Sequence, residues 1–404
     1  MEYLKFNTSH KKEKMFDKIL MFLIIILLFF TPISRSGLNI FAFFILVIWI
    51  SKKIVCPWTR KYNINKLKWL FGYSLLILLS TINAVDKYEA ISTFVSVYLK
   101  YIIIFLVVIE VVKKKKQINK LLITFLISSL LVYIYAFYQY FNYNFRIYST
   151  LHNPNPFGTY LTMVIFFSFC FAHYSDNLIY KIFGYIYGGI GGFLLIISYS
   201  RGAWLGFIFG IIAIILYLSY IDGKINFRKS MLVFLISLLL IGILLPDNVI
   251  ARFNSIFDLE GNSIKYRLMQ YQSAIEMIKD KPLLGHGLGQ YPKIFPRYKP
   301  DISRVHLHVH NLYLHWLVET GILGFLGLIV VVYKVISFKF LFKDNLELNW
   351  FILAMIGTMV SFIIHNIFDV TFLYSTVGLN LVVFYAILIS FTRIFEINKG
   401  VNNE

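Results

Sequence analysis

The sequence predicts an all-α polytopic membrane protein of about twelve transmembrane helices, with one long extracytoplasmic loop that contains an amphipathic helix. The chain of 404 residues is 58% hydrophobic and only 15% charged, with a mean hydropathy of +0.71, whereas soluble domains carry about 25% charged residues. Long apolar runs recur along the chain, and each is long enough to cross a bilayer. Backbone polar groups in lipid must be bonded within their own segment, so these runs are predicted to be helices.

The apolar runs divide the chain into successive spans with short connections. The predicted spans cover residues 19–33, 38–51, 67–82, 93–111, 119–141, 156–172, 181–198, 203–220, 230–245, 311–334, 350–366 and 371–391. No internal repeat or linker separates them, so residues 1–404 are predicted to form a single integral-membrane domain. The Lys-rich start of the chain resembles a signal peptide, but no small-residue cleavage site follows, so the first run is interpreted as a span.

The basic residues predict the orientation. The net charge is +19, and lysines and arginines concentrate in alternate connections, as the positive-inside rule describes for cytoplasmic loops. These connections contain Lys52, Lys53, Arg60, Lys61, Lys66, Lys68, Lys113 to Lys116, Lys120, Lys224, Arg228, Lys229, Lys334, Lys339 and Lys343. Both termini are therefore predicted to be cytoplasmic, and no basic stretch belongs to a soluble nucleic-acid-binding module.

One long hydrophilic segment, residues 246–310, interrupts this pattern and falls on the extracytoplasmic side. Loops of this length are usually functional or disordered. Within residues 263–279, apolar side chains recur at steps of four and three, which predicts one face of a helix that ends before Pro282. The face comprises Ile264, Leu268, Tyr271, Ile275 and Ile278. The helix is expected to lie on the membrane or to cap the bundle.

Two sets of glycines spaced by four residues predict close helix packing around Arg201. They are Gly184, Gly188 and Gly192, then Gly202, Gly206 and Gly210. Small residues at this spacing let helix backbones approach each other closely. Ordinary bundle packing accounts for most of this pattern. The close packing is also expected to make the backbone around Arg201 rigid.

Several cations on the outer side are candidates for anion binding. Arg201 lies at the outer end of two apolar spans, where an arginine either reaches the headgroup level or binds an anion. Arg267 lies beside the apolar stripe of the loop helix, so contact with anionic lipid is an alternative to a substrate role. Arg252 and Arg304 are weaker candidates on the same side.

A histidine cluster precedes the span at 311–334. His306, His308 and His310 alternate, yet no cysteine or acidic side chain supplies an evident further ligand, so a general base is favoured over a metal site. His310 is the candidate base, with Asn311 beside it. Glu319 lies deeper on the same span, where it either marks a polar interior or pairs with His315.

Two further polar positions lie at the predicted outer face. Asn153 opens the span at 156–172, where it serves either a site or simply the helix start, as a cap followed by proline. Asp369 is the last acid on the outer side, where it is predicted to neutralise an arginine or to orient a donor. Gly285, Gly287 and Gly289 follow no predicted strand, so they indicate a turn and not a dinucleotide site. Cys56 and Cys170 offer neither a disulfide framework nor metal-ligand spacing.

Taken together, these motifs resemble the O-antigen ligase and polymerase family. The resemblance covers roughly residues 150–330 and depends on Asn153-Pro154-Asn155, Ser200-Arg201-Gly202-Ala203-Trp204, the loop from Arg267 to Gly287, and His310-Asn311-Leu312-Tyr313-Leu314 with Glu319-Thr320-Gly321. The family's loop helix often carries a tryptophan four residues after the arginine, and here Tyr271 takes that position.

The resemblance implies a glycosyltransferase in the bacterial cytoplasmic membrane that needs no metal or other cofactor. It would move a glycan from undecaprenyl diphosphate to an acceptor hydroxyl on a glycan or lipid, with Arg201 and Arg267 on the diphosphate and His310 as the base. The expected partners are this donor, the acceptor, membrane lipids and other envelope polysaccharide assembly proteins. Ligase and polymerase remain open. A lipid-linked sugar flippase or transporter and a non-enzymatic assembly subunit are the alternatives.

Overall fold

The structure, a computed structural model, describes residues 2–57, 68–143, 146–222, 231, 247–254, 262–299, 307–336 and 346–401, and every regular element in these ranges is helical. The longer helices are α1 (Glu2–Phe30), α2 (Arg35–Val55), α3 (Lys68–Ser80), α5 (Lys100–Val111), α6 (Lys115–Asn142), α7 (Pro154–Tyr174), α8 (Leu178–Ile197), α9 (Arg201–Asp222), α12 (Asn262–Asp280), α14 (Leu312–Ile336), α15 (Leu346–His365) and α16 (Ser375–Val401). Shorter elements are η2 (Thr81–Asn83), α4 (Lys87–Thr93), η3 (Phe94–Leu99), η4 (Ser149–Leu151), α11 (Asp247–Asn254), α13 (Tyr291–Tyr298) and η5 (Thr371–Leu373). The predicted all-α class is thus confirmed.

Eight helices in the described part of the chain are long and apolar enough to cross a membrane, and 349–365 forms a shorter apolar helix. The predicted number of about twelve is therefore not established. The apolar part of α1 is short because lysines and acids occupy its first half, and α3 has 13 residues. The predicted span at 230–245 lies outside the described residues, apart from Met231.

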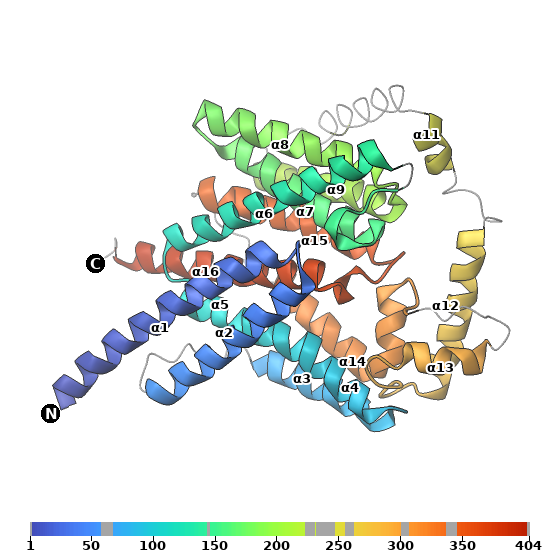
Figure 1. Ribbon diagram of the computed structural model, residues 1–404, viewed down its shortest axis with the longest axis horizontal. Coiled ribbons are helices and arrows are strands. Elements are labelled where there is room, and N and C mark those ends of the chain that lie inside the picture. Colours follow the sequence, from blue (N-terminus) through green and yellow to red (C-terminus); the bar gives the residue numbers. More distant parts are fainter. Residues whose placement is uncertain are drawn as a thin grey trace.

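The helices form one bundle whose two ends differ (Figure 1). The start of α1 and the end of α16 lie at one end, and α12 and α13 cover the opposite end. At the centre, α7 packs between α8 and α15, and α16 packs on α5. The ring of Phe384 on α16 lies 4.8 Å from that of Phe125 and 4.5 Å from that of Phe167. Aromatic contacts of this kind fill the core of the bundle.

Glycines bring α9 against α15, as predicted from their spacing. A Cβ on Gly206 would lie 2.5 Å from the Ser361 carbonyl oxygen, and one on Gly210 would lie 2.7 Å from that of Gly357. No side chain fits between these backbones, so α9 and α15 are fixed at close range. Gly192 differs from the other members of the two sets because a Cβ there would meet open space.

Helix α14 is broken at Gly321, which the sequence did not predict. Gly321 has φ 64° and ψ −172°, a backbone region that only glycine adopts readily. The loop after α12 fills the break: the amides of His286 and Gly287 donate to the carbonyls of Val318 and Glu319 at 2.8 and 2.9 Å. The amide of Ile322 in turn donates to the Pro282 carbonyl at 2.8 Å. Non-helical backbone in a span needs such partners.

Helix α12 covers residues 263–279, which were predicted to be helical, but its buried face differs from the predicted one. Gln270, Ala274 and Met277 are buried, whereas Leu268 and Ile275 are 50% and 46% exposed. The small side chain of Ala274 lets the helix approach its neighbours, and Ala274 and Met277 share an apolar cluster with Val318 of α14. The exposed leucine and isoleucine fit contact with the membrane surface.

An ion-pair network joins α1, α2 and the end of α5. The Nζ of Lys52, whose side chain is fully buried, lies 2.6 Å from Asp17 Oδ1 and 2.5 Å from Glu110 Oε1. Lys53 and Lys113 add pairs to Glu110 and Asp17 at 2.7 and 2.8 Å. A buried lysine needs such partners because its charge is costly to remove from water.

Candidate functional site

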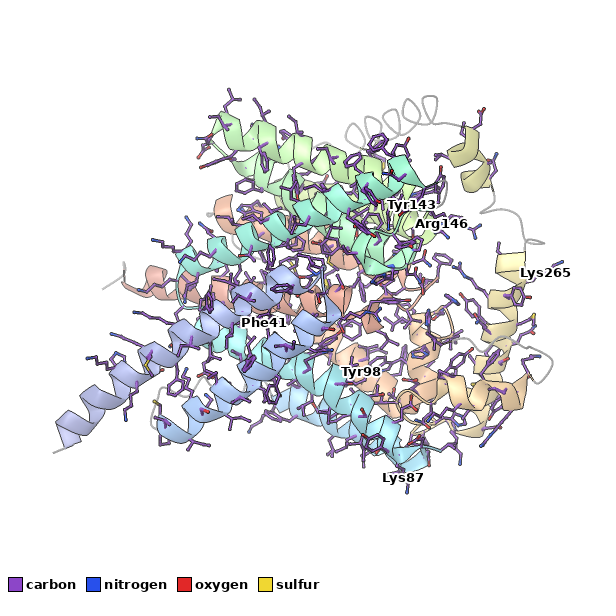
Figure 2. The ribbon with its side chains drawn as sticks, viewed as in Figure 1. Phe41, Lys87, Tyr98, Tyr143, Arg146 and Lys265 are labelled. Atoms are coloured by element: carbon purple, nitrogen blue, oxygen red, sulfur yellow. The ribbon has the colours of Figure 1, made fainter. Side chains whose placement is uncertain are left out.

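A cavity at the end of the bundle covered by α12 brings together side chains from five separate segments. It is lined by Arg146, Asn155, Arg201, Gly202, Arg267, His365 and Phe368. Figure 2 shows Arg146 at the same end of the bundle as Lys265 on α12 and Lys87 at the start of α4. Three of the lining side chains are arginines, and none of the described lining residues is acidic. The cavity therefore attracts an anion.

Arg201 is placed by a tight turn between two helices. Helix α8 ends at Ile197 and α9 begins at Arg201, while Tyr199 between them has a left-handed φ of 53°. Such a conformation is strained in a non-glycine residue and concentrates at functional sites. An arginine at a helix N-terminus adds positive charge to the positive end of the helix dipole, so the start of α9 is suited to an anion.

Arg267 reaches the cavity from α12. Tyr271 lies one turn further along the same helix, and its hydroxyl donates to the carbonyl of His310 at 3.1 Å. Burial raises the pKa of the Tyr271 hydroxyl, so it stays protonated as a donor. Tyr271 therefore ties the helix of Arg267 directly to the backbone of His310.

His365 forms one wall of the cavity and is buried at the end of α15. Its Nδ1 lies 2.7 Å from the Thr159 hydroxyl. A Cβ on Gly202 would lie 2.5 Å from Cδ2 of His365. Gly202 is therefore required for the imidazole to pack against the start of α9.

Asp369 is the centre of a buried polar network beside the cavity. Its Oδ1 lies 3.2 Å from His308 Nε2 and 3.4 Å from His310 Nδ1, and it accepts the Val370 amide at 2.7 Å. Asn155 donates through Nδ2 to the other carboxylate oxygen. Burial alone would raise the pKa of Asp369, but the two histidines hold it well below its ordinary range. The group is therefore a carboxylate at neutral pH.

His310 is held from two sides at the start of α14. Its φ of 58° is left-handed, and the next residue, Asn311, accepts the Leu314 amide at 2.9 Å through its side chain, as a helix cap does. The cap fixes the backbone while Asp369 faces Nδ1 of the ring. An imidazole oriented by a carboxylate at one nitrogen is suited to accept a proton at the other.

The same residues include a set with metal-ligand spacing. One ligand atom each from His308, His310 and Asp369 lies within 4.8 Å of the others. The sequence offered no acid for these histidines because Asp369 follows two helices later. The carboxylate also bonds Asn155 and the Val370 amide, which fits an orienting hydrogen-bond network as well as a metal site, so tests of the site need a chelator.

Four other predicted residues lie apart from this network or outside the described part. Asn153 caps α7 by accepting the Asn155 amide at 2.9 Å, and its Nδ2 donates to the Tyr374 hydroxyl at 3.1 Å. Glu319 does not line the cavity, because its Oε1 lies 3.5 Å from Nε2 of His315 and both side chains are buried. The side chain of Arg252 lies outside the described residues, as does Arg304.

The structure adds side chains that the sequence did not select as site residues. Arg146 looked like an ordinary charge in a short outer connection, and no periodicity marked it. Asn155 belonged to the Asn153-Pro154-Asn155 motif, but its contact with Asp369 spans 214 positions along the chain. His308 was one of the alternating histidines, and its pairing with Asp369 depended on the same unseen proximity.

Comparison with known proteins agrees with the motifs. Residues 186–329 match a family model described as O-antigen ligase. The matched stretch contains Arg201, Arg267 and His310, and it lies within the region of predicted resemblance. No curated protein matches the chain. The family match confirms the resemblance to the O-antigen ligase and polymerase family.

Proposed function

Since residues 186–329 carry an O-antigen ligase domain, we propose that the protein transfers a glycan from undecaprenyl diphosphate to an acceptor hydroxyl at the outer face of the bacterial cytoplasmic membrane. The family match supports glycosyl transfer in polysaccharide biosynthesis at a coarse level. The multi-pass helical bundle supports a lipid-linked substrate. The single observation that carries the finer proposal is the arginine cavity beside the Asp369 and His310 pair.

Arg201 and Arg267 bind the diphosphate in this proposal. Guanidinium groups stay charged at all physiological pH values and match phosphate oxygens with paired donors. Both line the cavity, together with the first turn of α9. They stabilise the negative charge that develops on the diphosphate as it leaves, a role that needs the donors fixed before the reaction.

His310 acts as the general base. Its ring takes the proton from the acceptor hydroxyl as the oxygen attacks the anomeric carbon of the donor sugar. The new glycosidic bond forms, the bond from that carbon to the diphosphate oxygen breaks, and its electron pair leaves with the diphosphate. Asp369 faces Nδ1 and stabilises the imidazolium that results. A base opposite the leaving group favours inversion at the anomeric carbon.

The end of the bundle with α12 and α13 is extracytoplasmic in this proposal, and the end with both chain termini is cytoplasmic. The placement of the start of α1 and the end of α16 together at one end supports it (Figure 1). The end of α2, whose last turn carries Lys52 and Lys53, also lies away from α12 (Figure 1), in agreement with the positive-inside rule.

The test follows glycan transfer by the purified full chain in nanodiscs. The substrate is undecaprenyl-diphosphate-linked oligosaccharide from the native host, the products are resolved by gel and mass spectrometry, and EDTA is present throughout. His310→Ala is expected to lose about 10²- to 10⁴-fold in rate. Arg201→Ala is expected to lose about 10- to 100-fold because charge-assisted hydrogen bonds disappear. Arg35→Ala, an exposed cation in a separate hollow, is the matched control and should keep wild-type activity.

The pattern of products separates the remaining alternatives. A ladder of longer carrier-linked glycans identifies a polymerase, and transfer of one block to a different acceptor identifies a ligase. Activity that EDTA abolishes and zinc restores would assign the His308, His310 and Asp369 set to a metal and overturn the metal-free proposal. A lipid-linked glycan that stays unchanged with several acceptors would contradict transfer and direct the work to transport assays.

A further inference from the structure

Arg146 is held rigidly beside the proposed diphosphate site. It lies in the connection between α6 and α7 and is half-buried. Its Nε donates to the Ser198 carbonyl at 3.3 Å, and its Nη2 donates to the Tyr199 carbonyl at 3.0 Å. Ser198 is the C-cap of α8, and a cation at a helix C-terminus is favourable because the last carbonyls carry partial negative charge.

These two bonds fix the guanidinium relative to Arg201. The carbonyls that Arg146 holds belong to the turn that immediately precedes Arg201, and that turn includes the left-handed Tyr199. A guanidinium carries five N–H donors on one plane, so bonds to two carbonyls leave its charge intact while they set its direction. Fixed donors stabilise charge better than mobile ones because they need no reorganisation during a reaction.

The cavity concentrates positive charge that an anion would stabilise. Arg146 lines it together with Arg201 and Arg267. Like charges enclosed together repel each other, and this repulsion is relieved when a multivalent anion binds. A monovalent headgroup would neutralise only part of this charge. The number of guanidinium groups therefore matches a ligand that carries more than one negative charge.

The reaction itself changes the charge of the ligand. The carrier-linked donor is a diphosphate diester with two negative charges. When the bond between the sugar and the diphosphate breaks, the leaving oxygen retains the electron pair, and the undecaprenyl diphosphate carries a third negative charge until it binds a proton. The acceptor proton goes to His310, so the third charge appears at the phosphate end of the cavity.

We propose that Arg146 is a third diphosphate-binding residue, matched to the charge that the diphosphate gains as it leaves. This inference rests on the proposed function. It predicts that Arg146 contributes more to binding of the product undecaprenyl diphosphate than to binding of the glycan-linked donor. Its loss should therefore lower kcat more than it raises the KM for the donor, because the interaction strengthens only as the bond breaks.

The experiment measures the binding of undecaprenyl diphosphate and of undecaprenyl monophosphate to the full chain in detergent, from the shift in thermal midpoint with ligand concentration. Arg146→Gln should weaken diphosphate binding about 10-fold and monophosphate binding less. Arg146→Lys keeps the charge but loses the planar pair of bonds to the two carbonyls. It should therefore retain more of the diphosphate affinity than Arg146→Gln, but less than the wild type. Arg35→Gln, which alters the exposed cation of the separate hollow, should bind both lipids as the wild type does.

A second measurement uses the wild-type protein and does not depend on a folded variant. Phenylglyoxal modifies accessible arginines, and mass spectrometry quantifies each site. Undecaprenyl diphosphate should protect Arg146 to the same degree as Arg201, and leave Arg35 equally reactive. Equal modification of Arg146 with and without the lipid would overturn the inference.

The outcomes separate the inference from the proposal beneath it. If Arg201→Gln weakens diphosphate binding and Arg146→Gln does not, Arg146 only holds the turn and the inference is wrong. If Arg201→Gln, Arg267→Gln and Arg146→Gln all bind undecaprenyl diphosphate as tightly as the wild type, the cavity is not a diphosphate site and the proposed function loses its main support. Parallel weakening by all three variants supports both.

Discussion

Replacement of Asp369 by asparagine tests whether the buried carboxylate drives the chemistry at His310. The substitution keeps the size of the side chain and one oxygen, which can still accept the Val370 amide. The other oxygen, which accepts from Asn155, becomes an NH₂ group that can donate to the Asn155 amide oxygen once that amide rotates. It removes the negative charge that faces Nδ1 of His310 at 3.4 Å. Asp369→Asn should therefore leave the fold and the donor site in place and slow the proton-transfer step.

The magnitude follows from the charge that His310 acquires. A full positive charge on the imidazolium at 3.4 Å from Asp369 is stabilised by about 5 kcal/mol at an effective dielectric constant near 20. The asparagine oxygen and solvent recover part of this, so about 2.5 to 5 kcal/mol of transition-state stabilisation is lost. Each 1.36 kcal/mol corresponds to about a factor of ten in rate, so the expected loss in kcat is about 70- to 5,000-fold.

The assay is single-turnover transfer of the lipid-linked glycan in nanodiscs, with donor saturation measured in parallel. The rate at saturation should fall, and the donor concentration at half-saturation should change little because the arginines are unaltered. Asp86→Asn is the matched control, since Asp86 is an acid near α4 that pairs with Lys293 on the surface and lies outside the cavity. A variant Asp369→Asn that keeps a tenth or more of the wild-type rate, at an unchanged thermal midpoint, would refute the assignment of Asp369 as the group that orients and stabilises His310.

Three further predictions concern the fold and its response to pH. Gly321→Ala should lower the free energy of unfolding in detergent by about 2 to 4 kcal/mol, because its left-handed backbone is packed against the Leu283 carbonyl. Gly192→Ala, where the added methyl group meets open space, should be close to neutral. Equal effects of the two substitutions would contradict the account of the α14 break. Burial lowers the pKa of His286, so the folded protein binds fewer protons than the unfolded chain, and the free energy of unfolding should fall as the pH drops from about 6.5 towards the lower folded pKa. Chemical unfolding at several pH values should show that the stability of His286→Gln depends less on pH than that of the wild type. Identical pH profiles would contradict this prediction. Lys52→Ala removes the buried cation between two acids and should lower the free energy of unfolding by about 3 to 5 kcal/mol. Lys53→Ala, which removes a half-exposed cation, should lower it by only about 0 to 1 kcal/mol. Similar losses in the two variants would show that burial does not set the strength of this network.

The sequence predicted the parts of the molecule whose signal is local. Apolar runs predicted the helices, and the glycine spacing predicted that the helix after Arg201 packs closely against a neighbour, because both signals depend on residues near each other in the chain. The structure identifies that neighbour as α15. Arg201, Arg267 and His310 were selected because each lies in an unusual local setting, at a span end, beside an apolar stripe or in a histidine cluster. The structure places the two arginines in one cavity.

The remaining features depend on contacts between distant residues. The partner of His310 is Asp369, which lies 59 positions further along the chain. The sequence of the short segment around Asp369 does not indicate which histidine it contacts. The glycine at the α14 break looked like any other glycine in an apolar run, because its distinguishing feature is the loop that bonds to the carbonyls around it. Arg146 was overlooked because its role depends on two carbonyl groups that follow a different helix.

The break in α14 bears on where the membrane surface lies. In the proposed orientation, the helix from Gly321 to Lys334, the first cation towards its cytoplasmic end, rises about 20 Å at 1.5 Å per residue, which is less than the hydrocarbon thickness of about 30 Å. The turn of α14 above the break, with the inserted loop around His286, is therefore expected at the depth of the outer headgroups. A diphosphate attached to a lipid already resides at that depth. A carrier lipid that diffuses within its own leaflet would then meet the arginines from the side, with its hydrocarbon tail still in the bilayer, and only the sugar would need to enter from the water.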